Sequence, residues 1–313
     1  MSERSRIALL RERLERDAPG VRVGIGDDAA VLEPGLVWTV DVQVENTHFK
    51  LDWVSWEDIG WRSFMAAASD LAAMGAEPAF ALSSLILAPS VDDAALDALA
   101  RGQAAASLAV GAPVVGGNLA RGTETSITTT LLGRAAAPVL RKGARPGDGV
   151  WLAGPVGLAA AGLAVLMHDG AMQDVRIAAC IDAWRRPVAR VAEGRGLAGV
   201  AHAAIDISDG LAHDAWQLAE ASEVGLVLDA QAILAHMTRD LAAAASRVGR
   251  EPLDLALHGG EDYALLAASA SPLAGFVRIG TIEPYGGGCA RLFLSTARGT
   301  EPLEPRGFDH FSV

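Results

Sequence analysis

Short runs of β-branched and apolar residues alternate along this chain with longer alanine- and leucine-rich stretches, and the pattern predicts a mixed α/β protein. Strands are expected at Leu36–Val44, Thr125–Leu132, Val150–Ala153, Ala203–Ile207, Gly225–Leu228, Asp262–Ala267, Phe276–Gly280 and Ala290–Leu294. Helices are expected at about 6–17, 56–74, 90–110, 157–169, 176–195 and 210–222. Ser55 and Asp58 have the spacing of a helix N-cap, which sets the start of the second helix.

The segment 134–149 differs from its surroundings because proline, glycine and basic residues replace the periodic pattern. Such a composition is typical of a junction between two folded units. We therefore expect two domains, residues 1–140 and residues 141–313. A chain of 313 residues is long enough to give each of them its own core.

Composition narrows the class of protein. Apolar residues make up 51% and charged residues 20% of the chain, with a mean hydropathy of +0.27, which indicates a folded globular protein. The net charge of -12 argues against sequence-independent binding of nucleic acid. Cys180 and Cys289 are far apart and predict neither a disulfide framework nor a zinc site. No apolar run is long enough to span a membrane, so no membrane partner and a cytoplasmic location are expected.

Aspartates recur beside small or apolar residues, where an unpaired charge is costly to bury. They occupy a glycine turn (Asp27, Asp28), the end of a strand (Asp41), an alanine-rich helix (Asp70) and a strand-to-helix turn (Asp206, Asp209). If these segments converge, their compensating cation is magnesium and its further ligand is a nucleotide phosphate. The alternatives are an ordinary turn at Asp28, a solvated Asp70, and a helix cap formed by Ser208 or Asp209.

Two glycine pairs and one histidine are further candidates. Gly116-Gly117-Asn118 ends an apolar run and is expected to be either a loop that approaches phosphate or a simple turn. Gly259-Gly260 precedes Glu261, which is expected to project toward a ligand, and His48 either meets an anionic substrate or is structural. The chain has no Walker A loop, kinase catalytic loop, GxGxxG or GxSxG pattern, so ATP would be bound by another architecture.

Taken in order, the motifs resemble those of the thiamine-monophosphate kinases, which belong to the superfamily of aminoimidazole ribonucleotide synthetase. The resemblance covers nearly the whole chain, through GIGDDAAVL, the stretch Asp41–Phe49, SDLAAMGAEP, VVGGN, LRKGARPGD, AIDISDGL, HGGEDYALL and GFDHF. It implies a two-domain fold of mixed sheets whose N-terminal domains pair into a β-barrel in a homodimer. It also implies phosphorylation of thiamine monophosphate to thiamine diphosphate by ATP, with several magnesium ions. A phosphate monoester is largely dianionic at pH 7, so no general base is expected for such an acceptor.

The resemblance assigns a role to each matching position. Magnesium ligands are implied at Asp28, Thr39, Asp41, Asp70, Asn118, Asp206 and Asp209, with Asp27 adjacent. Contacts to ATP are implied at Gly117, Asn118, Arg141 and Ser208, and contacts to thiamine monophosphate at His48, Glu261 and Phe308.

This sequence departs from the family pattern at three places. Asn118 stands where an aspartate is usual, so one metal ion is expected to bind more weakly. Val40 stands where a threonine ligand is common, and the usual Gly-Glu-Phe start is replaced by Met1–Leu9.

Two other functions remain open from the sequence. One is another enzyme of the superfamily that acts on a different phosphorylated molecule, although the chain has no cysteine before Cys180 of the kind selenophosphate synthetases use. The other is a nucleotide-binding relative that has lost turnover through Asn118 and Val40.

Overall fold

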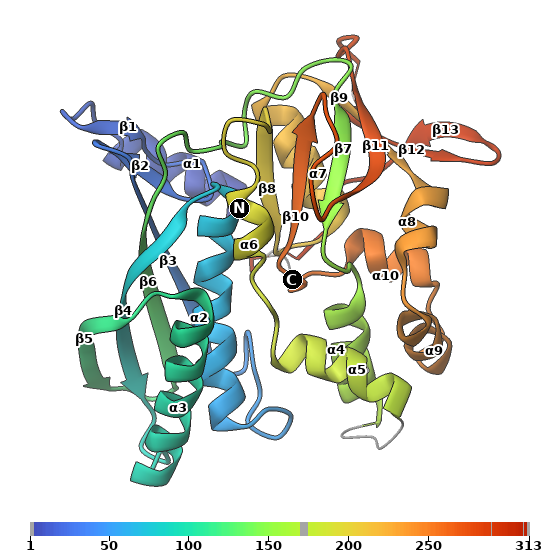
Figure 1. The fold of residues 1–313 in the computed structure, drawn as a ribbon. Helices are drawn as coiled ribbons and strands as arrows, with labels where there is room; N and C mark the ends of the chain where they lie inside the picture. Colours follow the sequence, from blue (N-terminus) through green and yellow to red (C-terminus); the bar gives the residue numbers. More distant parts are fainter. Residues whose placement is uncertain (1–2, 170–174, 289, 309, 312–313) are drawn as a thin grey trace.

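The computed structural model describes residues 3–169, 175–288, 290–308 and 310–311. Two sheets stand side by side with helices packed around and between them (Figure 1). The first sheet uses only strands that end by Arg134, and the second uses only strands that begin at Gly149 or later. None of the described helices is both long and apolar enough to cross a bilayer.

The N-terminal sheet has six strands, of which only β4 and β5 are parallel neighbours. In spatial order they are β1 (Val21–Val23), β2 (Ala30–Leu32), β3 (Leu36–Val44), β6 (Ser126–Arg134), β4 (Glu77–Leu87) and β5 (Val114–Arg121). Along β3, Thr39 is buried at 6% exposure whereas Val40 is 63% exposed, as the two-residue period of a strand requires. One face of the sheet is therefore covered and the other is open.

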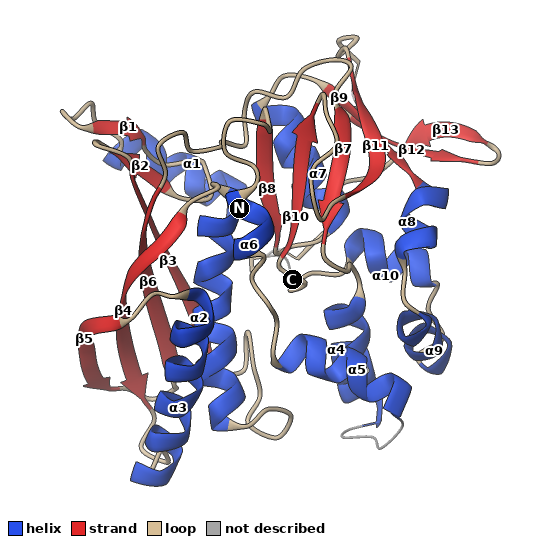
Figure 2. Ribbon diagram, in the orientation of Figure 1, coloured by secondary structure: helices blue, strands red, loops and turns tan. Residues whose placement is uncertain are grey.

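Two long helices cover the buried face of this sheet, α2 (Trp56–Ala73) and α3 (Asp93–Val110) (Figure 2). Helix α2 begins as its sequence predicts, because the hydroxyl of Ser55 accepts a hydrogen bond from the backbone N–H of Asp58 at 3.1 Å. It also contacts β8 and β10 of the second sheet, so it lies between the two halves of the chain. The short helix α6 (Val191–Arg195) packs against it, and α1 (Glu3–Leu14) lies at the surface with no buried residue.

The C-terminal sheet has seven strands and is antiparallel except where β12 pairs with β9. Its spatial order is β13 (Gly299–Pro302), β12 (Leu292–Thr296), β9 (Gly225–Asp229), β11 (Val277–Glu283), β7 (Gly149–Ala153), β10 (Ala264–Ser269) and β8 (Ala203–Ile207). Its helices are α4 (Leu158–Asp169), α5 (Val175–Arg185), α7 (Leu211–Ala221), α8 (Ala230–His236), α9 (Arg239–Arg247) and α10 (Pro252–His258).

Two expectations from the sequence are wrong, and several elements were not predicted. The helix expected at 176–195 is two helices, α5 and α6, because Pro187 lies between them. Gly116, Gly117 and Asn118 lie inside strand β5 and not in a loop. The strands β4 and β5 themselves, and helices α8 to α10, have no counterpart in the sequence prediction. Cys180 is buried in α5, and Cys289 lies outside the described residues.

Candidate active site

Three aspartates meet where α2 and the turn at Asp28 reach β8, the edge strand of the C-terminal sheet. Asp28 follows the glycine turn, Asp70 lies in the last turn of α2, and Asp206 lies in β8. Each offers a carboxylate oxygen within 4.8 Å of the others, and Asp28 and Asp206 are buried. The structure thus brings together three segments that are widely separated in the sequence.

The hydrogen-bond partners of these three carboxylates leave one buried oxygen without a partner. Thr39 Oγ1 donates to Asp70 Oδ2 at 2.5 Å. Arg141 donates to Asp28 Oδ1 from Nε at 2.9 Å and from Nη2 at 2.5 Å. Asp28 Oδ2 is buried and has no hydrogen-bond partner among the described residues. An unpaired carboxylate oxygen beside two further carboxylates fits a hard divalent cation, which takes oxygen ligands.

Burial makes these acids hold their protons to higher pH than exposed aspartates do when no cation is bound. It raises the pKa of Asp28 to about 6, although Arg141 opposes the shift. Burial, followed by the charge of a neighbouring carboxylate, raises the pKa of Asp70 and of Asp206 well above the usual 3.8. A divalent cation at this position would therefore displace protons and keep the carboxylates ionised.

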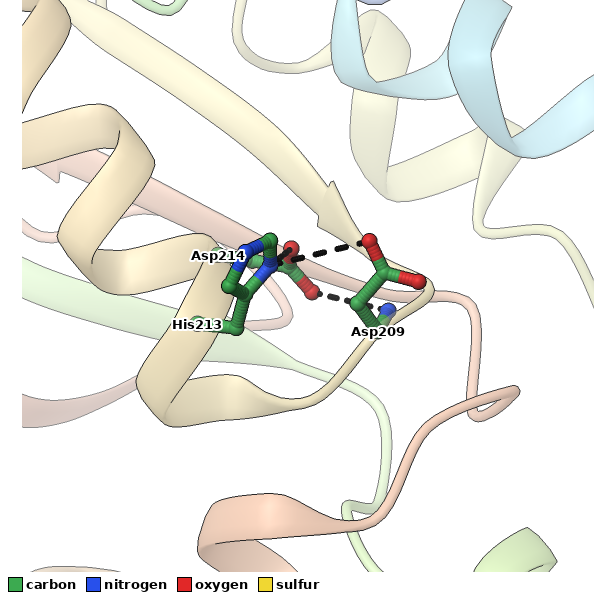
Figure 3. A group of neighbouring side chains, drawn as sticks. All are labelled: Asp209, His213 and Asp214. Atoms are coloured by element: carbon green, nitrogen blue, oxygen red, sulfur yellow. Dashed lines mark hydrogen bonds and ion pairs between the residues drawn. The ribbon is translucent and has the colours of Figure 1, made fainter. Parts of the chain in front are cut away.

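Asp209 lies in a second group with His213 and Asp214, and their side chains point toward one another (Figure 3). Asp214 accepts hydrogen bonds from the backbone N–H groups of Asp209 at 3.2 Å and Gly210 at 3.1 Å. Gly210 occupies the N-cap position of α7 and has no side chain with which to cap the helix. The expectation that Ser208 or Asp209 forms the N-cap is therefore wrong. Asp214 satisfies the turn from within the helix, and the Asp209 carboxylate lines the cleft with one oxygen 3.6 Å from His213 Nδ1.

A cleft of about 580 Å³ runs past both aspartate groups. Asp41, Asp70, Asp206, Ser208 and Asp209 line one part of it. Aromatic and imidazole side chains line another part, namely His48, Phe49, Trp53, Trp184, Phe308 and His310. The cleft therefore joins an acidic region suited to cations and an aromatic region suited to a flat ring.

His48 is an uncharged member of the aromatic region. Its Nδ1 accepts a hydrogen bond from the backbone N–H of Val44 at 3.0 Å, and its ring lies 4.9 Å from that of His310. Burial lowers the pKa of His48 to about 4, with a smaller effect from the neighbouring His310. Because Nδ1 accepts, the neutral imidazole carries its proton on Nε2, so at neutral pH it can donate a hydrogen bond from Nε2 but carries no charge.

Glu261 is fixed by two residues that the sequence reasoning missed. Arg62 donates to its Oε1, and Trp184 Nε1 donates to its Oε2 at 2.6 Å. The signal for Arg62 was present, because an arginine inside the apolar stretch of α2 has to find a buried partner. No comparable local signal marks Trp184.

Most of the predicted site residues share this cleft or border it, but two do not. Asn118 and Gly117 lie in the exposed edge strand β5, which β6 and β4 separate from β3, and neither lines the cleft. Gly117 is required there, since a Cβ atom would lie 1.7 Å from the carbonyl oxygen of Ser83. Val40, the position of a common threonine ligand, directs its side chain to the face opposite Thr39 and Asp41.

Comparison with known proteins decides the family. Residues 26–135 match the family described as AIR synthase related protein, N-terminal domain. The thiamine-monophosphate kinase of Aquifex aeolicus is 32% identical over 294 residues, which cover 92% of each chain. The chain belongs to the thiamine-monophosphate kinase family. A second member of this family, from Bacillus subtilis, is 31% identical and covers 93% of this chain and 94% of its own.

The fold is that of the thiamine-monophosphate kinase family as well. A solved structure described as AaThiL complexed with AMPPCP and TMP superposes with a TM-score of 0.89. It is 31% identical in sequence, and the match covers 99% of this chain and 97% of that one. The mixed two-sheet architecture predicted from the sequence is therefore confirmed.

Proposed function

We propose that this protein phosphorylates thiamine monophosphate to thiamine diphosphate with ATP and magnesium. The observation that carries the proposal is the unpartnered, buried Asp28 Oδ2 among the carboxylates of Asp70 and Asp206, at one end of a cleft whose other part is aromatic. Membership in the thiamine-monophosphate kinase family supplies the reaction to which this geometry is suited.

The acidic region suits a reaction between two polyanions. The acceptor is a phosphate monoester with a second pKa near 6, so it is largely dianionic at neutral pH and needs no general base. Bound magnesium would neutralise the phosphates and stabilise charge on the transferred group. Asp28, Asp41, Asp70, Asp206 and Asp209 would supply the oxygen ligands.

Two neutral or basic groups orient these ligands. Thr39 orients the Asp70 carboxylate, and Arg141 fixes Asp28 Oδ1 while leaving Oδ2 free. We propose direct in-line transfer from ATP to the acceptor, without a phosphoenzyme.

The aromatic region suits the organic part of the acceptor. The thiazolium ring of thiamine is cationic, and a cation is attracted both by aromatic faces and by a carboxylate such as Glu261. His48 is neutral and Phe308 is apolar, so neither repels that charge. We also propose that Arg141 and Ser208 contact ATP. Arg141 lies beside the acidic region, where it bonds Asp28, and Ser208 lines the same part of the cleft.

A homodimer belongs to the same proposal. The open face of the N-terminal sheet carries exposed apolar side chains at Trp38, Val40, Phe80, Leu82 and Ile86. A contiguous apolar face of this kind on a soluble domain is typical of an interface. A second copy that covers it would also bury strand β5, which carries Gly117 and Asn118 at the edge of the sheet.

The test measures ADP and thiamine diphosphate in one reaction. Purified protein is supplied with ATP and magnesium, with or without thiamine monophosphate, and the products are separated by chromatography. Equimolar ADP and thiamine diphosphate are expected, and Asp206→Asn should reduce both by about 100-fold or more. Intact ATP binding without thiamine diphosphate would reject the proposal and point to another acceptor or to lost turnover.

A further inference from the structure

Arg62 is a charged side chain held entirely inside the protein, with 1% exposure, on the face of α2 that meets the C-terminal half. Its Nε donates to Gln43 Oε1 at 3.2 Å, and its Nη1 donates to the carbonyl oxygen of Trp184 at 2.8 Å. Its Nη2 donates to Glu261 Oε1. The guanidinium also stacks over the Trp184 ring, with 4.6 Å between Cζ and the ring centroid. A buried arginine with this many partners fixes the relative positions of all of them.

The backbone of Glu261 is in a conformation that local structure alone would not select. Its φ is +65°, in the left-handed region that residues with a Cβ atom rarely adopt. The surroundings hold it there, since Glu261 N donates to the carbonyl oxygen of Ser208 at 2.7 Å and Tyr263 N donates to that of Ile207 at 2.9 Å. These two bonds attach the segment to the strand end that carries Asp206.

The Glu261 carboxylate is held by hydrogen bonds from Arg62 and Trp184 and is partly exposed to the cleft. One oxygen accepts from Arg62 and the other from Trp184 Nε1 at 2.6 Å. The side chain nevertheless remains 24% exposed and lines the cleft. Each oxygen therefore retains a lone pair that neither Arg62 nor Trp184 occupies, while these two residues set the direction of the carboxylate.

We infer that Arg62 and Trp184 are positioning residues that orient the Glu261 carboxylate toward the organic part of the acceptor and thereby set acceptor affinity. The inference rests on the proposed function for the identity of the acceptor. The hydrogen bonds that orient Glu261 are present whatever the acceptor is. A positioned carboxylate keeps its direction without rearrangement when the acceptor binds, so loss of either support weakens binding of the acceptor and leaves binding of ATP unchanged.

Trp184→Phe is the sharpest variant, because it removes the indole N–H and keeps an aromatic ring beside Arg62. Losing one hydrogen bond to a charged group should raise KM for thiamine monophosphate about tenfold, with KM for ATP and kcat within twofold of wild type. Arg62→Lys should raise the same KM by at least as much, since a lysine cannot reproduce the guanidinium's fixed array of donors.

Trp61→Phe is the matched control. It removes an indole hydrogen bond of similar length from the same inter-domain region, because Trp61 Nε1 donates to the carbonyl oxygen of Pro187 at 2.7 Å. Trp61 does not line the cleft, so this variant should lower Tm without raising KM for thiamine monophosphate. If Trp184→Phe raised that KM no more than Trp61→Phe does, the inference would be overturned.

A crystal structure of Trp184→Phe separates this inference from the proposed function. A displaced or disordered Glu261 carboxylate supports the positioning role even if wild type makes no thiamine diphosphate. A carboxylate in the wild-type orientation overturns that role, whatever the enzyme's substrate is.

Discussion

Asp70→Asn should make the metal-free protein more stable while it removes most of the activity. The change keeps the size of the side chain, and the amide oxygen can still accept from Thr39 Oγ1. It removes one negative charge from a group of three carboxylates whose oxygens lie within 4.8 Å of one another. In the proposed enzyme it also removes a magnesium ligand, which should lower kcat by about 100-fold or more.

The size of the stabilisation follows from Coulomb repulsion. Two unit charges 4.8 Å apart repel by about 3 kcal/mol at an effective dielectric constant near 20. Asp70 faces both Asp28 and Asp206, so neutralising it relieves at least one such repulsion when the acids are ionised. We expect a rise in Tm of up to about 5 °C for the metal-free variant at pH 8, where more of these acids are ionised than at pH 5.

The effect should depend on pH with a definite sign. The pKa of Asp28 is about 6 in the folded protein and 3.8 when the side chain is exposed. Between these two pH values the folded protein therefore binds more protons than the unfolded chain. Stability of the metal-free wild type should therefore fall as pH rises from 3.8 to about 6, by about 3 kcal/mol from Asp28 alone, and stay low above it. The raised pKa values of Asp70 and Asp206 act in the same direction.

Thermal unfolding of EDTA-treated wild type and Asp70→Asn, at pH 5 and pH 8 and with or without magnesium, tests the reasoning. Magnesium should raise the Tm of wild type at pH 8 and have much less effect on the variant. The loss of activity is tested by measuring the steady-state rate of thiamine diphosphate formation for the same two proteins. A metal-free Asp70→Asn protein less stable than wild type at pH 8, or one with near-normal turnover, would refute the electrostatic account of this site.

Three further results are expected. Asn118→Asp should leave the magnesium concentration needed for half-maximal activity unchanged, because Asn118 lies on the edge strand β5 outside the cleft; a concentration lowered several-fold would place Asn118 at a metal site, since a carboxylate binds magnesium better than an amide oxygen. The pKa of about 4 predicts that NMR will show His48 neutral at pH 6, whereas a midpoint near 6.5 would contradict its burial. Leu82→Arg, on the open face of the N-terminal sheet, should convert a dimer into monomers in sedimentation velocity, with Leu108→Arg on the outside of α3 as control; a dimer that persists would place the interface elsewhere.

Local features of the fold could be predicted from the sequence because neighbouring residues determine them. The strand Leu36–Val44 has the predicted bounds, and Ser55 caps α2 as its spacing indicates. Strand β5 could not be predicted in this way, because its glycine pair disfavours an isolated strand. Parallel pairing with β4 overrides that preference, and the close approach of Ser83 to Gly117 explains why glycine is needed there.

The sequence by itself determined the kinds of residue at the site and their order along the chain. Aspartates in apolar surroundings indicated a cation, because burying their charge without one is costly. Only the tertiary structure decided that Asp28, Asp70 and Asp206 meet, that Asn118 lies on a distant edge strand, and that Arg62 reaches Glu261 across the two halves. Caps and periodicity act over a few residues, whereas these distances are set by how α2 packs between two sheets.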